Sequence, residues 1–318
     1  MRLFLIILMI PFSLFAFHEH DENDESYSSK NEVLLEETLN SAEPTLKYIY
    51  NTVNSVAKSV DEFLSNDYSD EKYYDSYIHI ETSMKKIEGY STDFDANVDI
   101  RIKLKKTSKK YRLVINNSDD NVSDEFKDHN ETVPFEDDDY NIGIEYQSFK
   151  KYINFKSNLG IKASTNPYIY IKASASKEFK LSKRSSYEIE QKLRYSDRFE
   201  LDSTTSLAYH KKLDDTYTFV NQNKYFINSK EQVDNIYNSL RINQQLNQRD
   251  YINYVAALNS NNDESNFQDK RYRAYISYRK FLKKWMYYDL IPEVSFNRDD
   301  NFEERYGFTV NIGILIDK

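Results

Sequence analysis

Apolar and polar residues alternate along most of this chain, from about residue 75 to the end. One run has Phe94, Ala96, Val98, Ile100, Ile102 and Leu104 at its apolar positions, separated by Asp95, Asn97, Asp99, Arg101, Lys103 and Lys105. The last segment repeats the pattern with Tyr306, Phe308, Val310, Ile312, Ile314 and Ile316. Because successive side chains of a strand point to opposite faces, this period of two predicts strands with one apolar and one polar face. Such strands are typical of a transmembrane β-barrel, whose apolar side meets lipid.

The first 16 residues have the pattern of a secretory signal peptide. Arg2 supplies a short positive region, residues 3–10 are apolar, and residues 11–16 end in the small residue Ala16. The apolar run is too short to anchor the chain as a membrane helix. No cysteine is present, so a disulfide framework is excluded. We therefore expect an exported protein.

The composition limits which classes of protein this chain can belong to. A net charge of −9 argues against nucleic acid as a partner. The 28 tyrosines and 19 phenylalanines argue against disorder, and tyrosine suits a surface that meets both lipid and water. No segment after Ala16 is apolar enough for a transmembrane helix, so a membrane form of this chain must be a closed sheet.

The predicted connections fall into two classes that alternate along the chain. Short, mostly basic connections are expected at residues 106–110, 149–151, 180–184, 211–215, 247–250 and 280–284. Acidic or polar, often longer ones are expected at 89–93, 118–139, 164–167, 196–199, 227–232, 260–269 and 298–303. This alternation predicts an up-and-down antiparallel barrel of about 14 strands (12–14), with tight turns at the periplasmic rim. An even number places both ends of the barrel at that rim.

The N-terminal quarter has a different pattern. Residues 17–30 read as a disordered acidic tail, and residues 31–70 as a periplasmic or lumenal helical segment. Within it, Pro44 starts an expected amphipathic helix over 44–66, with apolar residues at three- and four-residue steps. Its apolar stripe could rest on the barrel opening, a second copy or a periplasmic partner. The expected barrel covers residues 75–318.

Two stretches carry a resemblance to a known group of proteins. They are DANVDIRIKLKKTSKKYRLVI at residues 95–115 and WMYYDLIPEVSFNRDDNF at residues 285–302. Both resemble recurring segments of uncharacterised proteobacterial outer-membrane β-barrel proteins, over about the C-terminal three quarters of the chain. The resemblance implies a location and a fold but no catalytic residue. The chain departs from the wider outer-membrane pattern by ending in Asp317 and Lys318, where barrel assembly signals end in an aromatic residue.

Few residues suggest catalysis or metal binding. No phosphate-binding loop, nucleophile elbow or zinc motif is present, and only His79, His129 and His210 offer a base within the body. Ser206 lies four residues before His210, too far along a strand for direct contact. The acidic connection 118–139 could hold divalent cations near lipopolysaccharide, although it lacks the ligand spacing of a calcium loop. We expect no cofactor, no metal site and no catalytic residue.

The polar face of the strands supplies the candidate functional residues. The lumen charges expected from alternation are Arg101, Lys103, Arg112, Glu145, Lys172, Glu190, Arg194, Arg271, Arg273, Asp289 and Glu293. In a pore, rings of such charges set selectivity; paired across strands, they would instead fill and stiffen the barrel. The sequence leaves both alternatives open.

The sequence thus predicts an outer-membrane β-barrel of a Gram-negative bacterium, acting as a passive, porin-like channel or as a structural envelope protein. Its partners would be membrane lipid, lipopolysaccharide and the barrel assembly machinery. Two alternatives remain. One is a membrane-embedded hydrolase of lipid or lipopolysaccharide, which needs His79 or His210 beside a serine or carboxylate. The other is a soluble periplasmic antiparallel-sheet binding protein, favoured by polar residues at outward positions (Gln191, Ser203, Thr205, Asn238 and Gln244).

Overall fold

The computed structural model describes residues 47, 51–53, 55, 58–59, 61–62, 76–104, 110–117, 140–149, 153–163, 166–198, 200–230, 233–263 and 266–317. The chain divides into two units, Met1–Ser55 and Val56–Lys318, and all of the strands lie in the second. None of the helical residues in the described ranges belongs to a helix long and apolar enough to cross a membrane.

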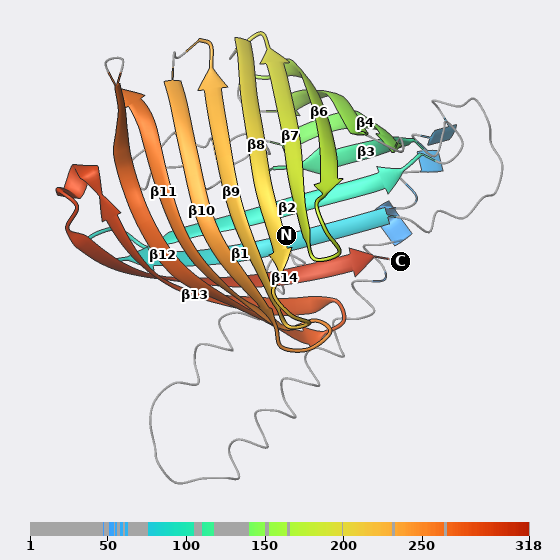
Figure 1. Cartoon of the computed structure of the whole chain (residues 1–318). Coiled ribbons are helices and arrows are strands. Elements are labelled where there is room, and N and C mark those ends of the chain that lie inside the picture. The colour runs from blue at the N-terminus through green and yellow to red at the C-terminus, as the bar shows by residue number, and fades with distance from the viewer. Residues whose placement is uncertain are drawn as a thin grey trace, which may run out of the picture. The chain divides into compact units, whose positions relative to one another are not determined.

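The described strands form one closed antiparallel barrel (Figure 1). They are β1 (Ser76–Ile87), β2 (Asp93–Lys103), β3 (Tyr111–Asn116), β4 (Tyr140–Phe149), β5 (Asn154–Ala163), β6 (Tyr168–Lys180), β7 (Ser185–Ser196), β8 (Glu200–Lys212), β9 (Tyr217–Asn228), β10 (Val233–Gln245), β11 (Tyr251–Asp263), β12 (Asn266–Lys283), β13 (Met286–Asn297) and β14 (Glu304–Asp317). Each strand pairs with its neighbours in sequence, and β1 closes the barrel by pairing with β14. The predicted up-and-down barrel of 14 strands is confirmed.

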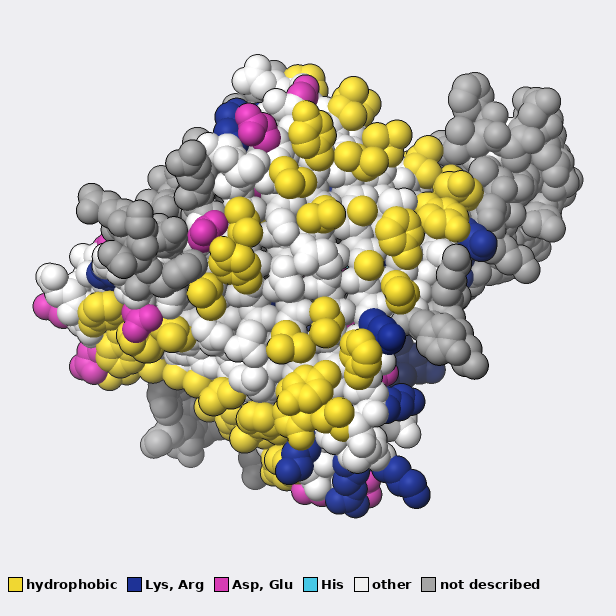
Figure 2. All heavy atoms as spheres, turned by 45° about the horizontal axis from the view of Figure 1, so that its top comes forward, with side chains coloured by type: hydrophobic (Ala, Val, Ile, Leu, Met, Phe, Trp, Pro, Cys, Tyr) yellow, Lys and Arg dark blue, Asp and Glu magenta, His cyan; other side chains and the backbone are white. Residues whose placement is uncertain are grey.

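The register separates an apolar outer face from a polar inner face. Ile78 stands opposite Ile100 and Ile316, while its neighbour His79 stands opposite Asp99 and Leu315. Large apolar side chains on the outer face of β4–β12 are exposed, as at Leu159 (61%) and Ile169 (60%). Figure 2 shows hydrophobic side chains spread over the wall of the barrel, with Lys and Arg gathered at one edge. An apolar outside is the arrangement that a lipid bilayer requires.

On one part of the outer face the apolar side chains are buried and not exposed. The predicted lipid-facing row of β2 is exposed at Phe94 (70%) but buried at Ile102 (1%). Its outward neighbours towards the tight-turn rim, Ile78, Met286 and Ile314, are also buried. The register places Ile102 on the outward face, as predicted, but its side chain is buried and not exposed to lipid, because alternation gives the face of a residue and not its exposure.

The polar residues on the outer face bond to one another. Thr205 donates its hydroxyl to Gln191 Oε1 (2.7 Å), and Gln191 Nε2 donates to Ser203 Oγ (2.9 Å). Tyr254 likewise donates to Gln244 Oε1 (3.0 Å). Since polar groups facing lipid are costly only when unpaired, these pairs make outward polar positions compatible with a membrane.

The two rims carry the two expected classes of connection. A tight turn joins β8 to β9, and there the carboxylate of Asp214 accepts hydrogen bonds from two backbone N–H groups. In the tight turn between β10 and β11, the side-chain oxygen of Asn247 also accepts hydrogen bonds from two backbone N–H groups. Such side-chain bonds are how Asp and Asn hold a turn. The opposite rim includes a 3-10 helix, η1 (Arg298–Asp300). The predicted loop at 260–269 is wrong: β11 and β12 pair as far as Asp263 and Asn266, with a bulge beside Ser260. Polar composition there marks strand ends and not a long loop.

The predicted N-terminal helix over 44–66 is not supported as an element. The described residues there, 47, 51–53, 55, 58–59 and 61–62, are helical, the residues between them lie outside the described ones, and no helix with bounds is given for this segment. The signal peptide (1–16), the acidic tail (17–30) and the acidic connection (118–139) lie outside the described residues.

Candidate functional site

The inner wall of the barrel carries the candidate functional residues. Among described strand residues at inward positions of the register, 17 are basic and 14 are acidic. The bases are Lys85, Arg101, Lys103, Arg112, Lys156, Lys162, Lys172, Lys180, Lys192, Arg194, Lys212, Lys224, Arg241, Arg271, Arg273, Arg279 and Arg305, and the acids Glu81, Asp93, Asp95, Asp99, Glu145, Glu178, Glu188, Glu190, Glu200, Asp202, Asp263, Asp289, Glu293 and Asp317. The inward side therefore has an excess of positive charge, although the whole chain has a net charge of −9.

The register places all of the predicted lumen charges on this inward side. Several form pairs between or along strands: Arg112 lies 3.6 Å from Glu145, and Lys192 lies 3.6 Å from Glu190. Arg101 binds Asp99 two residues earlier on β2 through its Nε (3.0 Å). Lys172 lies 4.9 Å from the centre of the Tyr170 ring, and Lys103 stands opposite Arg112.

A buried ion pair holds the β7 and β8 side of the wall. The guanidinium of Arg194 binds the carboxylate of Asp202, its opposite residue on β8, with Nε 2.5 Å from Oδ2. Asn228 of β9 donates to the other carboxylate oxygen of Asp202 (2.5 Å). Arg194 and Asp202 are 5% and 1% exposed, so they need these partners to offset lost hydration.

A larger network links β1, β12, β13 and β14 near the tight-turn rim. Arg279 and Asp289 form a two-pronged ion pair with both N–O distances 2.6 Å. The guanidinium lies 3.7 Å from the centre of the Tyr287 ring, and the Tyr287 hydroxyl donates to Glu81 (2.6 Å). Tyr287 is fully buried and fits because Gly313 faces it: a Cβ at Gly313 would overlap the phenol ring. Tyr287 and Asp289 are buried on this side of the wall, while Arg279 and Glu81 are partly exposed.

A second group of charges lies further along the same strands. Glu293 on β13 forms an ion pair with Arg273 on β12, and its other oxygen lies 4.0 Å from Lys85 on β1. The Glu293 side chain has no exposed surface. One acid therefore serves two bases here, which leaves the group with net positive charge.

On the opposite side of the lumen, the inner face of β7 and β8 is exposed towards the tight-turn rim. On β7 and β8 the inward side chains of Glu188, Lys192 and His210 are 48%, 37% and 39% exposed. In a closed barrel an inward side chain with such exposure borders water-filled space. Solvent therefore reaches one part of this wall, while the part nearer the loop rim is buried at Arg194 and Asp202.

The two described histidines, His79 and His210, are not hydrogen-bonded to a serine or a carboxylate. His79 Nε2 lies 2.6 Å from the Tyr287 hydroxyl, which itself donates to Glu81. His210 Nε2 lies 3.8 Å from Glu188, beyond hydrogen-bond distance. Ser206 stands opposite Glu190 and Lys224, away from His210. In the described part of the chain neither histidine is hydrogen-bonded to a serine, and His129 lies outside it.

Sequence reasoning missed the tyrosines and asparagines of the wall. Tyr287 joins two charged pairs, and Asn228 completes the Arg194–Asp202 pair. Alternation could have assigned both to the inner face, since Tyr287 is two residues from Asp289. Their partners depend on strand register, which a single sequence does not reveal.

Comparison with solved structures finds outer-membrane proteins. A loop deletion mutant of OmpT, an outer membrane protein of Vibrio cholerae, is 8% identical over 76% of this chain and 98% of that chain, with a TM-score of 0.48. The outer membrane channel DcaP of Acinetobacter baumannii is 7% identical over 76% and 96%, with a TM-score of 0.43. The KdgM porin in complex with disordered oligogalacturonate is 10% identical over 74% and 98%, with a TM-score of 0.37. No protein-family model and no curated protein matches the chain.

Proposed function

We propose that this protein is a passive channel of the outer membrane that admits small hydrophilic solutes and prefers anions. The observation that carries the proposal is the exposure of inward side chains on β7 and β8, at Glu188, Lys192 and His210. Polar side chains reached by solvent inside a closed barrel are what a water-filled path requires. The protein acts by transport and has no catalytic role.

The preference for anions follows from the charges of the inner wall. The inward bases outnumber the inward acids, 17 to 14, among the described strand residues. Low-dielectric walls of one net charge concentrate counter-ions between them. Pairing leaves this excess unchanged, because each ion pair removes one charge of each sign.

The expected path is narrow. Fourteen strands lie between small barrels that side chains fill and the barrels of 16 to 18 strands that leave an aqueous channel. The packed wall of β12 and β13 takes up part of this space, since Tyr287, Asp289 and Glu293 are 5% exposed or less. We therefore expect small conductance and slow passage of large solutes.

The outward surface of the barrel suits the outer membrane. The exposed apolar side chains of β4–β12 match a lipid environment, and the N-terminal signal pattern supports export. Lipid and lipopolysaccharide would surround the wall, divalent cations could bridge the acidic connection 118–139, and the barrel assembly machinery would insert the protein.

Conductance in planar bilayers tests the proposal. The full-length protein should give discrete conductance steps, and deletion of residues 31–66 should raise their size if this segment occupies part of the lumen. Equal conductance of the two proteins would place the segment outside the path. A folded barrel that gives no steps with or without the deletion would overturn the channel and leave a structural envelope protein.

A further inference from the structure

A patch of polar side chains lies on the outward face of β7–β10, near the middle of these strands. Its members are Gln191 of β7, Ser203 and Thr205 of β8, Asn221 and Asn223 of β9, and Asn238 of β10. The register joins them into one surface, because Gln191 stands opposite Thr205 and Asn223 stands opposite Asn238. We call this surface the amide patch.

The amide patch lies at the depth where lipid tails surround a barrel. Four members lie five to seven residues from either end of their strands: Gln191, Thr205, Asn223 and Asn238. Exposed apolar side chains flank the patch, as at Leu193 toward the loop rim and Leu240 toward the tight-turn rim. Lipid headgroups therefore do not reach the patch, and lipid tails offer no group that forms a hydrogen bond.

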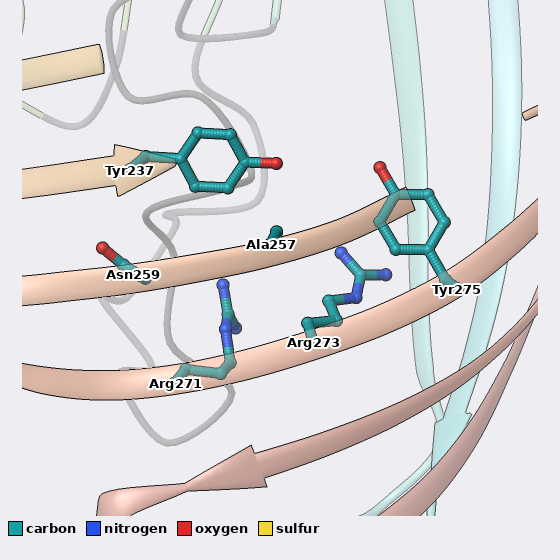
Figure 3. Close-up of a pocket in the computed structure, with 6 residues that line it drawn as sticks. All are labelled: Tyr237, Ala257, Asn259, Arg271, Arg273 and Tyr275. Atoms are coloured by element: carbon teal, nitrogen blue, oxygen red, sulfur yellow. The ribbon is translucent and has the colours of Figure 1, made fainter. Parts of the chain in front are cut away.

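The outward direction of these side chains follows from their inward neighbours. Tyr237 precedes Asn238 on β10 and is 4% exposed. Figure 3 shows Tyr237 lining a pocket of the inner wall together with Asn259 of β11 and Arg271 of β12, its neighbours across the register. Because successive side chains of a strand point to opposite faces, Asn238 points away from the lumen.

Hydrogen bonds within the amide patch leave some of its polar groups unused. Asn223 donates to Asn221 Oδ1 (3.1 Å), and Asn221 donates to the backbone carbonyl of Ser239 (3.4 Å). Within the described part of the chain, Asn223 Oδ1 and the whole side-chain amide of Asn238 have no hydrogen bond. Each amide offers two N–H donors and one carbonyl oxygen, so a bond between Asn223 and Asn238 would still leave groups unused.

Unused amide groups at this depth are costly in a membrane. The hydrocarbon core holds no water, so an N–H or C=O group there needs a partner from protein. Between membrane-embedded helices, polar side chains form such bonds and small side chains permit close approach. Ala173 and Ala175 of β6 are small outward residues at the edge of the patch, and Ala175 stands opposite Gln191. The patch thus has the composition of a contact between two membrane proteins.

A second copy of this chain is the partner that the patch fits. An amide both donates and accepts, so Asn223 and Asn238 can bind the same residues of a copy. Copies inserted in one orientation bring their patches together at equal depth, and one patch on each copy makes a closed pair about a two-fold axis. A larger ring would need a second, complementary surface, yet the described outward residues near the middle of β12, β13 and β14 are apolar, as at Ile276, Leu290 and Val310.

We propose that the protein forms a dimer in the membrane through the amide patch. The amides of Asn223 and Asn238 bind those of the second copy near a two-fold axis along the membrane normal, and the flanking leucines pack around them. The two lumens then lie side by side with the same orientation. The dimer rests on the membrane location proposed above, but it does not depend on ion flow.

Disulfide cross-linking in lipid vesicles tests the dimer, because the chain has no cysteine of its own. Leu207→Cys places a thiol opposite Asn223 and keeps every amide of the patch, and Ile276→Cys places one on β12 at a matched outward exposure (41% and 43%). The full-length variants are diluted in excess lipid, oxidised and separated on a non-reducing gel. Leu207→Cys should give linked dimers, and Ile276→Cys should stay monomeric.

Removal of the amides tests their part in the dimer. Asn223→Leu combined with Asn238→Leu, in the Leu207→Cys background, should raise the dissociation constant of the dimer about tenfold, measured from the linked fraction over a series of protein-to-lipid ratios. Thr82→Leu in the same background should leave it unchanged, because Thr82 is an outward polar residue of β1, outside the patch. Circular dichroism verifies the strands of each variant, which leucine should preserve since it suits a lipid-facing position.

Equal linking of Leu207→Cys and Ile276→Cys would overturn the dimer, as would a dissociation constant that the paired leucines leave unchanged. Linking to a different protein in native membranes, with only monomers in vesicles of purified protein, would assign the patch to that protein instead. A barrel that does not insert into vesicles would overturn both the location and the dimer. A dimer without conductance would keep the dimer and remove the channel, and a conducting monomer would do the reverse.

Discussion

At the scale of single residues, the packed side of the lumen depends on one glycine. Tyr287 occupies the space in front of Gly313 and from there reaches His79, Glu81 and Arg279. A side chain at residue 313 would push the phenol ring away from all three. The glycine thus permits the network without taking part in it.

Gly313→Ala should therefore lower the free energy of unfolding by about 1–3 kcal/mol, the usual cost of overpacking. Urea unfolding in micelles, followed by circular dichroism, measures this. The control is the same substitution in a Tyr287→Ala background, where the new methyl group has room and should cost little. An equal loss in both backgrounds would show that Gly313 is needed for some other reason.

Asp250 gives the tight turn between β10 and β11 a dependence on pH. The backbone N–H of Phe281 (2.9 Å) and the side chain of Asn247 (2.7 Å) donate to its carboxylate, and these bonds hold its pKa below the ordinary value of 3.8. A carboxylate with a lowered pKa stabilises the fold above its unfolded pKa, and this contribution is lost as the pH falls through the lower, folded pKa.

Asp250→Ala should lower stability at pH 7 by about 1 kcal/mol, the typical worth of lost hydrogen bonds. The difference from the unsubstituted protein should shrink as the pH falls from 7 through the lowered, folded pKa, because the native carboxyl group then also becomes protonated. Urea unfolding across this pH range measures both effects. Asp250→Asn, which keeps an acceptor, should lose less than Asp250→Ala. A difference that does not change with pH would contradict the role given to the charge.

At the scale of the strand, alternation predicts the faces of the sheet, and it does so because a strand repeats every two residues whatever its surroundings. All predicted lumen charges share one face for this reason. Alternation cannot tell which parts of an outer face are covered, as Ile102 shows, nor where strands extend into a polar segment, as at 260–269. The Arg194–Asp202–Asn228 group needs the register of three strands, and one sequence does not contain that information.

Adjacent positions on β5 test the two faces with one substitution. Leu159 points outward and is 61% exposed, whereas Asn158 points inward and stands opposite Glu145. Leu159→Arg should destabilise the inserted protein by about 2–4 kcal/mol, because it places a charge in lipid. Asn158→Arg should be nearly neutral. Unfolding from lipid vesicles compares them, and equal losses would contradict the assignment of the faces.

The connections between strands give a test of orientation. If both barrel ends lie at the periplasmic rim, the connection 118–139 between β3 and β4 lies at the cell surface. An epitope inserted at Asn130 should be labelled by antibody on intact cells. Labelling of an epitope at Lys183, in the tight turn between β6 and β7, should require rupture of the outer membrane. The opposite result would invert the orientation of the barrel.

At the scale of the whole molecule, the net charge of the chain is negative, whereas the net charge of the described inward strand positions is positive. The chain carries a net charge of −9, yet its described inward strand positions carry 17 bases and 14 acids. The surplus of acidic residues therefore lies in the rest of the sequence, outside these inward positions. Ions that enter the barrel meet the wall at close range, where screening by salt is weakest.

The reversal potential of the channel tests the central claim most directly. The full-length protein is placed in a planar bilayer between potassium chloride solutions that differ about tenfold in concentration, and the voltage of zero current is measured. The positive lumen predicts a reversal potential displaced toward the equilibrium potential of chloride, with the displacement reduced at higher salt because of screening. Displacement toward the equilibrium potential of potassium, or a folded barrel that carries no current, would contradict the account.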